Sequence, residues 1–507
     1  MAALGRFRRW LAQSIAPTPR PEIEESTVRG RYDAAQTTTG NSQHWAASDA
    51  LDADSANSQG VCRKLTQRSR YEINNNGHAK GIVLTHANYV VGRGPTLRMQ
   101  TGSEGFNRMV ETAWQSWARR VDLARKLRTA IKAKVTDGEA LLIAVDNEGN
   151  GDKVSLDLRL IETEQCTSNY IDLLRPNKID GIEFDELGNP TVYEIMEHHP
   201  GSAWSHLDMK PRRVPAKWVM HLFREDRPGQ HRGIPEITST LGLFAQGRRW
   251  REATVVAAEN IANWSVFLKT QMLPSVDMDT VRPLTSLPID KGMMTALPAG
   301  YDAFQPKPEQ PSANYDMFNR SMLNEEARPL NMPYNIAAAD SSGYSFSGGR
   351  LDHLTYFVSL DVEQAEIEEQ LLAPVFALWF YEAVLAYQWE VPPAPEPRHG
   401  WNWPAKPQID QSKTANGRKT ALAFGGVTLG RIYAEDGADF EDELPKMARE
   451  YGVTPDEMRG ILLRQIFSSA QEEPEDDEPE EVLDKPKRSN ATASRMIHGL
   501  PGGNGDN

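Results

Sequence analysis

The order of apolar and polar residues predicts helices on either side of a β-rich segment. Apolar residues follow helical spacing over 65–91 and over 106–134. Between 139 and 223, short apolar runs are separated by turn residues. Strict alternation, as in a half-buried strand, covers Val154, Leu156, Leu158 and Leu160. The pattern therefore predicts an α+β protein that is mostly helical.

A rigid turn precedes the next predicted helix. The run Arg227–Pro235 contains two glycines and two prolines within nine residues. Pro235 stands where a helix can begin, because the first helical turn does not need its N–H group. The helical pattern continues from 236 to 268. Seven prolines between 271 and 311 then exclude a continuous helix, and another helix is predicted over 315–330.

The longest predicted helix follows a segment of loop composition. Residues 340–350 hold three glycines and four serines, which predicts a loop. No glycine lies between Gly349 and Gly400, and Pro374 is the only proline before Pro392. A helix of about 40 residues, roughly 60 Å long, is expected with a kink near Pro374. A smaller helical region covers 410–468.

Charge and cysteine content narrow the possible functions. The 507 residues carry a net charge of −14. This charge argues against a protein that holds nucleic acid by neutralising its phosphates, but it allows a protein past which nucleic acid slides. Cys62 and Cys166 make neither a disulfide framework nor a four-cysteine zinc site, so a reducing cytoplasm is expected. The basic segment 1–21 has amphipathic spacing and fits a docked short helix, with a transit peptide or membrane-surface helix as the alternative. The apolar run Leu371–Tyr381 is too short to span a membrane.

The sequence carries no catalytic signature that would support an enzyme. The sequence contains no Gly-Lys-Ser or Gly-Lys-Thr phosphate loop and no Gly-x-Ser-x-Gly elbow. The adjacent His198 and His199 have no acid cluster at ligand spacing, so surface histidines are favoured over a metal site. Asp137-Gly-Glu139 is interpreted as a turn that leads into a strand over 140–145. We expect no catalytic residues, metal or cofactor.

Two groups of residues are candidates for contact with a partner. Arg248, Arg249 and Arg251 lie beside Trp250 on the predicted 236–268 helix. They fit either a DNA backbone or the acids of a neighbouring subunit, and we favour subunit pairing. The 340–350 loop can reach a ligand, and its candidate residues are Ser341, Ser342, Gly343, Tyr344, Ser345, Phe346 and Arg350.

Several dispersed segments, weak singly but specific in order and spacing, resemble the portal proteins of lambda-like tailed bacteriophages and prophages. The resemblance covers about residues 30–450. The segments are Arg31–Ala35, Arg68–Arg70, Asn74–Asn76, Val90–Gly94, Asp137–Glu139, His199–Gly201, Arg213–Pro215, His221–Phe223, Arg227–Pro235 and Met332–Tyr334 with the loop to Arg350. The sequence departs from the family in that loop, where relatives usually have a Ser-Ser pair closer to the arginine. The acidic tail has no family role to transfer.

The resemblance implies a homo-oligomeric ring, normally of twelve subunits, at one capsid vertex. Double-stranded DNA passes through such a ring, without sequence specificity, during packaging and ejection. The implied partners are the terminase large subunit, head-completion or connector proteins, and the major capsid and scaffold proteins, with no membrane. The implied location is the virion, after assembly in the cytoplasm of the bacterial host. Because no ATP site was found, the ring is expected to be passive.

The parts of the family fold can be assigned along the chain as expectations. They are an N-terminal arm (1–60), an α+β wing (61–234), a first stem helix (235–270), a clip (271–316), a second stem helix (317–338), a tunnel loop (339–350), a long wing helix with a proline-rich spacer (351–400), a crown-like helical region (401–468) and a disordered acidic tail (469–507). The alternatives are another capsid or baseplate structural protein and, from a different class, a nucleic-acid-processing enzyme of a mobile element.

Overall fold

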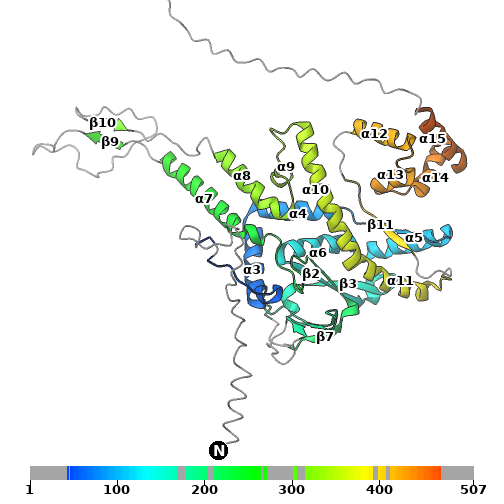
Figure 1. Ribbon diagram of the computed structural model, residues 1–507, viewed down its shortest axis with the longest axis horizontal. Helices are drawn as coiled ribbons and strands as arrows, with labels where there is room; N and C mark the ends of the chain where they lie inside the picture. The colour runs from blue at the N-terminus through cyan, green and yellow to red at the C-terminus, as the bar shows by residue number, and fades with distance from the viewer. Residues whose placement is uncertain are drawn as a thin grey trace, which may run out of the picture. The chain divides into compact units, whose positions relative to one another are not determined.

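The computed structural model divides into two compact units (Figure 1). It describes residues 43–44, 46–167, 177–203, 210–263, 267–270, 301–304, 315–391, 398–406 and 411–469. The first unit contains Met1–Lys80, Ala133–Ile143 and Leu160–Tyr315, and the second contains Gly81–Lys132, Ala144–Arg159 and Asp316–Asn507. Most of the expected N-terminal arm, most of the proline-rich clip and the acidic tail lie outside the described residues.

The first unit combines helices with antiparallel sheets. Its helices are α2 (Ala53–Ala56), α3 (Gln59–Asn75) and α7 (Leu241–Asn263), together with the first residues of α4 (Gly77–Val91) and the end of α6 (Leu123–Asp137). The predicted helix over 65–91 is therefore interrupted. Asn76 takes an extended conformation between α3 and α4.

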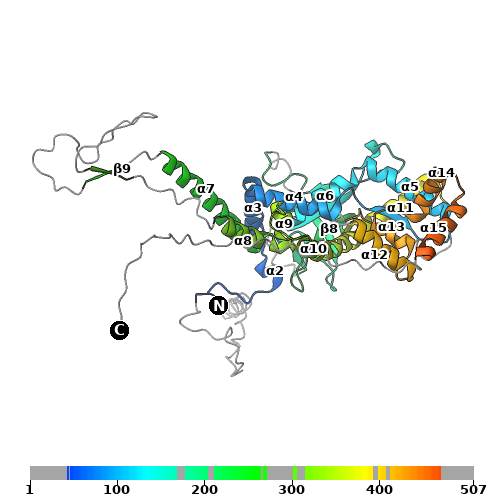
Figure 2. The same ribbon diagram turned by 90° about the horizontal axis from the view of Figure 1, so that it is seen from above.

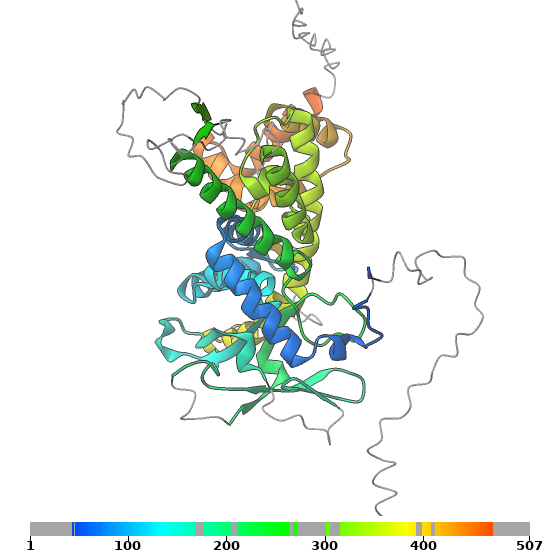
Figure 3. The ribbon, with the colours of Figure 1, turned by 90° about the vertical axis from the view of Figure 1, so that its left-hand side faces the viewer.

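Both predicted groups of strands are present. One sheet has the order β3-β2-β8, from strands Leu156–Ile161, Glu139–Asp146 and Val219–Phe223. The second sheet has the order β4-β5-β6-β7, from Lys178–Ile179, Ile182–Phe184, Pro190–Ile195 and Arg212–Pro215. Its strands are the teal to green arrows low in Figure 3. Leu141, Cys166, Ile182, Tyr193 and Ile195 are buried together between these strands.

The helix after the rigid turn is shorter than the sequence predicts. A 3-10 turn at Thr238–Thr240 comes first, and α7 begins only at Leu241. Phe267–Thr270 forms strand β9, antiparallel to β10 (Tyr301–Phe304), so the helix does not reach 268 (Figures 1 and 2). The late start has a local cause, because the carbonyl of Pro235 accepts the N–H of Thr238 and closes a tight turn.

The second unit is mostly helical. Its further elements are β1 (Thr96–Met99), α5 (Glu104–Arg120), α8 (Tyr315–Ala327, from its second residue), α9 (Tyr334–Ala338), α10 (Phe346–Ile367), α11 (Ala373–Tyr387), β11 (His399–Asn402), α12 (Gln411–Ala423), α13 (Leu429–Glu435), α14 (Phe440–Tyr451) and α15 (Pro455–Ser469). The β1 strand pairs antiparallel with β11. With the first unit, this confirms a mostly helical α+β fold.

The predicted long helix is confirmed, and the irregularity near its proline is a π turn. Helices α10 and α11 follow one another in Figure 1 and are joined by one π-helical turn at Glu368–Leu372, which ends two residues before Pro374. A proline cannot donate to the preceding turn, and inserting a residue there accommodates the lost bond. The inner face of α11 packs on α5, where the rings of Trp114 and Trp379 lie 5.1 Å apart, edge to face.

Candidate functional site

The predicted DNA-facing loop is shorter than its composition suggests. Helix α10 already begins at Phe346, so Phe346 and Arg350 are helical and the expectation of a loop to 350 is wrong. Ser345 explains the difference, because its side chain accepts the N–H of Gly348 at 3.2 Å and caps the helix. The loop that remains, 340–345, contains Gly343 with φ of 81°.

The base of this loop is held by α8. The Arg320 guanidinium lies 4.8 Å above the Tyr334 ring and donates to the carbonyl of Ser342. Hydrogen bonds from Ser342, with the positive charge of Arg320 nearby, lower the pKa of the Asp340 carboxyl. The loop therefore has an anchored base and a turn at its tip.

The arginine group on α7 has partners within its own chain. Arg248 forms an ion pair of 3.1 Å with Glu72 of α3 and lies over the Tyr71 ring. Arg251 donates to the Asn76 side chain at 3.4 Å. The hydrogen-bond partners Glu72 and Asn76 lie 176 and 175 residues away along the chain, so the sequence pattern does not indicate them. Arg249 is exposed, and its contact with DNA or another subunit stays a prediction.

Arg232, from the rigid turn, is the centre of a buried polar network. Its Nε lies 2.9 Å from Glu139 Oε2, and its Nη1 lies 2.9 Å from Asp180 Oδ2. Nη1 also donates to the carbonyl of Cys166 at 2.9 Å. Glu139 accepts from the backbone N–H of Gly233 as well. Burial acts to raise the pKa of Glu139, but Arg232 and His221 outweigh it and hold the pKa below its ordinary value.

Two glycines allow close contact between the backbones of the segments that carry Arg232 and Glu139. Gly138 has φ of 98°, and a Cβ atom there would lie 2.4 Å from the backbone carbon of Ile234. A Cβ atom on Gly233 would lie 2.1 Å from the carbonyl oxygen of Gly138. The Asp137–Glu139 turn and the rigid turn are thus in backbone contact, which only glycine permits at these positions.

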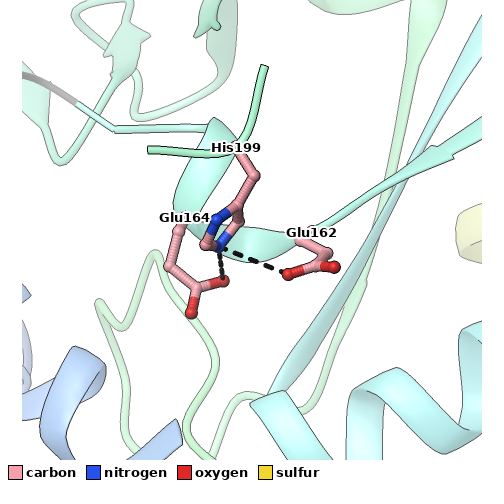
Figure 4. Close-up of side chains that lie close together, drawn as sticks. All are labelled: Glu162, Glu164 and His199. Carbon is pink, nitrogen blue, oxygen red and sulfur yellow. Dashed lines mark ion pairs between the residues drawn. The ribbon is translucent and has the colours of Figure 1, made fainter. Parts of the chain in front are cut away.

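A second network lies beside the first and includes one of the predicted surface histidines. Arg70 of α3 binds Asp137 at 2.8 Å and Glu164 at 2.9 Å. His199 Nε2 lies 3.3 Å from Glu162 and 3.6 Å from Glu164 (Figure 4). Burial raises the pKa of Asp137 despite the opposing effect of Arg70.

The spacing of Glu162, Glu164 and His199 would suit a divalent cation, but their hydrogen bonds favour an ion-pair network. The N–H of Gly201 donates to His199 Nδ1 at 3.0 Å, so a neutral His199 carries its proton on Nε2. That nitrogen then carries a proton at ion-pair distance from both carboxylates, although it forms no hydrogen bond with them. A protonated ring nitrogen has no lone pair to offer a metal. Arg70 also already supplies a cation to both glutamates.

A small polar cavity lies among these residues of the first unit. Both cysteines line it, together with Gln59, Thr167 and Arg232. Burial raises the pKa of the Cys62 thiol to about 11 and that of Cys166 to about 12. Both are therefore protonated and poorly nucleophilic at neutral pH. The arrangement is suited to holding segments together and gives no activated nucleophile.

One helix of the second unit passes a simple test for a membrane span. Ser347–Tyr387 is long and apolar enough by length and composition, and 33% of its most apolar window is buried. Part of this helix is held by polar contacts within the second unit. The Glu382 side chain accepts from Ser155 Oγ at 2.9 Å and from the Leu156 N–H at 3.2 Å.

Comparison with known proteins identifies the family. A family model described as "Phage portal protein, lambda family" matches residues 39–364. A "Probable portal protein" of Halomonas phage phiHAP-1 is 24% identical over 509 residues, which cover 92% of this chain and 96% of that protein. A chain in the solved virion of a native gene transfer agent particle covers 76% of this chain and 97% of its own length, with 11% identity and a TM-score of 0.46. A chain from the neck of that particle, computed with C12 symmetry, has 12% identity, a TM-score of 0.43, and coverage of 74% and 94%. Because the family model matches more than half of the sequence, the chain belongs to the lambda family of phage portal proteins, which are virion components that act in DNA packaging.

Proposed function

We propose that the chain forms a closed ring of twelve identical subunits that conducts double-stranded DNA through one capsid vertex. The observation that carries this proposal is the family match over 39–364. The charge pattern supports a channel that does not hold DNA, because Arg70, Arg232 and Arg248 are engaged by acids of their own chain. Strong phosphate contacts would slow translocation.

Within this ring, we assign roles to elements with the bounds that the structure gives them. Helix α7 is the first stem helix, and the segment between it and α8 is the clip. Residues 340–345 form the tunnel loop, with Arg350 one helical turn behind it. Helices α10 and α11 belong to the wing, and α12–α15 form the crown-like region. The network around Arg232 is the joint from which α7 starts.

The ring is passive in this proposal and depends on partners for energy and attachment. A terminase large subunit supplies ATP hydrolysis, and head-completion or connector proteins replace it after packaging. Major capsid and scaffold proteins surround the ring during assembly in the bacterial cytoplasm. ATPase or nuclease activity of the purified chain, abolished by one point substitution, would favour the enzyme alternative.

Electron microscopy and mass measurement of the purified full chain test the ring. Twelve subunits of 56.7 kDa give about 680 kDa, with an axial hole in projection. A monomer that persists across protein and salt concentrations, with or without scaffold protein, would refute the proposal.

A deletion tests the loop separately. Removing 341–344 spares the Ser345 cap and should leave ring assembly intact while impairing DNA packaging or retention. Removing the tip residues 186–188 of the β5–β6 turn is the control and should leave packaging and retention unchanged. Normal packaging and retention in the first deletion would show that the loop does not act on DNA.

A further inference from the structure

Helix α10 carries an exposed aliphatic stripe in addition to its buried face. Its members Leu351, Leu354, Val358 and Val362 are 51–66% exposed. At 100° per residue they fall within an arc of about 80° around the helix. We call these four residues the outer stripe.

The opposite side of the same helix is buried within the second unit. Tyr356, Leu360, Gln364 and Ile367 are buried and lie about 180° from the outer stripe. The Tyr356 hydroxyl lies 3.0 Å from His86 Nδ1, and the Gln364 amide donates to the Val90 carbonyl at 2.8 Å. The inner face therefore fixes α10 against α4, and the outer stripe cannot rotate inward to be covered.

The π turn extends the apolar face along α11. Tyr381 lies 19 positions after Val362, which in a regular helix would turn it about 100° away from the stripe. The π turn at Glu368–Leu372 accommodates one extra residue and removes this offset. Tyr381 is 73% exposed and Leu385 is 64% exposed on the continued face.

The size of this face indicates a protein interface. The six residues are 51–73% exposed. Together they expose roughly 700 Å² of mainly apolar surface along the two helices, above the roughly 300–600 Å² of the largest patch on a typical monomer. A standard interface buries about 800 Å² per partner, so the face supplies most of one. A bilayer fits less well, because Asp361, Glu363 and Glu366 lie within α10. A charged residue near the membrane centre costs about 2.5–3.5 kcal/mol.

We propose that the outer stripe binds a second copy of this chain, on a surface other than the neighbour's own outer stripe. The inference rests on the proposed ring. A ring closes only through a head-to-tail interface, in which two different surfaces meet at each junction. A stripe that paired with itself would give a two-fold dimer and would leave the ring open. The outer stripe is therefore one half of the ring-forming contact.

Val358→Asp is the main test, in the full chain. The residue is mostly exposed within the subunit, so its thermal unfolding should match the wild type, while the subunit concentration for half-assembly should rise at least 10-fold by mass photometry. Leu187→Asp is the matched control, because Leu187 is 88% exposed at a turn of the first unit and should assemble normally. Rings of Val358→Asp at wild-type concentrations would overturn the inference. If the wild type itself forms no ring, the proposed function fails first.

Val358→Cys identifies what covers the stripe. A maleimide should label this thiol rapidly in free subunits and at least 10-fold more slowly in rings. Oxidation should not link two subunits through their introduced cysteines, because the stripe does not pair with itself. Equal labelling in both states, or ready dimerisation, would overturn the inference. Protection in rings that is lost when residues 1–21 are removed would assign the stripe to the N-terminal segment instead. Flotation of the wild type with anionic phosphatidylglycerol vesicles, prevented by Val358→Asp, would assign it to a membrane.

Discussion

Replacing Arg232 by methionine should destabilise the first unit far more than replacing an exposed arginine. The change keeps most of the side-chain length but leaves Glu139 and Asp180 without the guanidinium that bridges them. Removing one partner of a buried ion pair typically costs about 3–5 kcal/mol. That is a large share of the roughly 5–15 kcal/mol that stabilises a typical domain.

The dependence on pH gives this prediction a second signature. The pKa of Glu139 is lower in the folded protein than its ordinary value, despite burial, because Arg232 and His221 favour the carboxylate. The stabilisation is therefore fully present above the unfolded pKa of about 4.3 and is lost as pH falls toward the folded pKa. The difference in stability between wild type and Arg232→Met should shrink below about pH 4.

Urea unfolding followed by circular dichroism, with hydrogen exchange on β2 and α3, measures the loss and locates it. Arg213→Met is the control, because Arg213 pairs with Glu183 while its side chain is 54% exposed, and it should lose at most about 1 kcal/mol. Losses of similar size in the two variants would refute the argument. A loss in Arg232→Met that stays constant from pH 7 to 3 would refute the pKa argument alone.

Three further predictions follow from local geometry. Gly138→Ala should lower the free energy of unfolding by more than about 2 kcal/mol, because its Cβ would overlap a neighbouring backbone at positive φ. Gly242→Ala in α7 is the control: its Cβ meets no atom within 4 Å, so thermal unfolding should show a neutral or stabilising effect. Burial raises the pKa values of the Cys62 and Cys166 thiols to about 11 and about 12. Both thiols should therefore react much more slowly with a disulfide reagent at pH 8 in the native protein than after denaturation; equally rapid reaction in the two states would contradict this. Thr454→Ala should lower the free energy of unfolding by about 1 kcal/mol, because it removes the side-chain oxygen that accepts the Glu457 N–H at the start of α15. An unchanged melting temperature would argue against this cap.

Elements specified by local signals were predictable from the sequence. The long helix was expected from 351 onward, because no glycine lies between Gly349 and Gly400, and the structure shows helix there. The capping box at Thr454 has both of its bonds. Local composition was misleading at 346–350, where Gly348 and Gly349 suggested a loop. The Ser345 hydroxyl caps a helix that begins at Phe346, two residues before Gly348.

The buried networks were not predictable in the same way, because their partners are distant in sequence. Arg70 and Asp137 are 67 residues apart, and Arg232 and Glu139 are 93 residues apart. Helical spacing and strand alternation are local patterns, so they cannot predict contacts between residues that are so far apart in the sequence. The available signal was that Arg68–Arg70, Asp137–Glu139 and Arg227–Pro235 are all segments that resemble the portal family.

The structure gives a physical reason why those short segments act together. Each is weak evidence alone, yet Arg70 binds Asp137, Arg232 binds Glu139, and Gly233 contacts the backbone of Gly138. Changing one segment leaves a buried charge unpaired or forces two backbones apart, and either costs several kcal/mol. The turn that precedes α7 is therefore held by the end of α6 and the start of β2, so the start of α7 is positioned by contacts within the first unit.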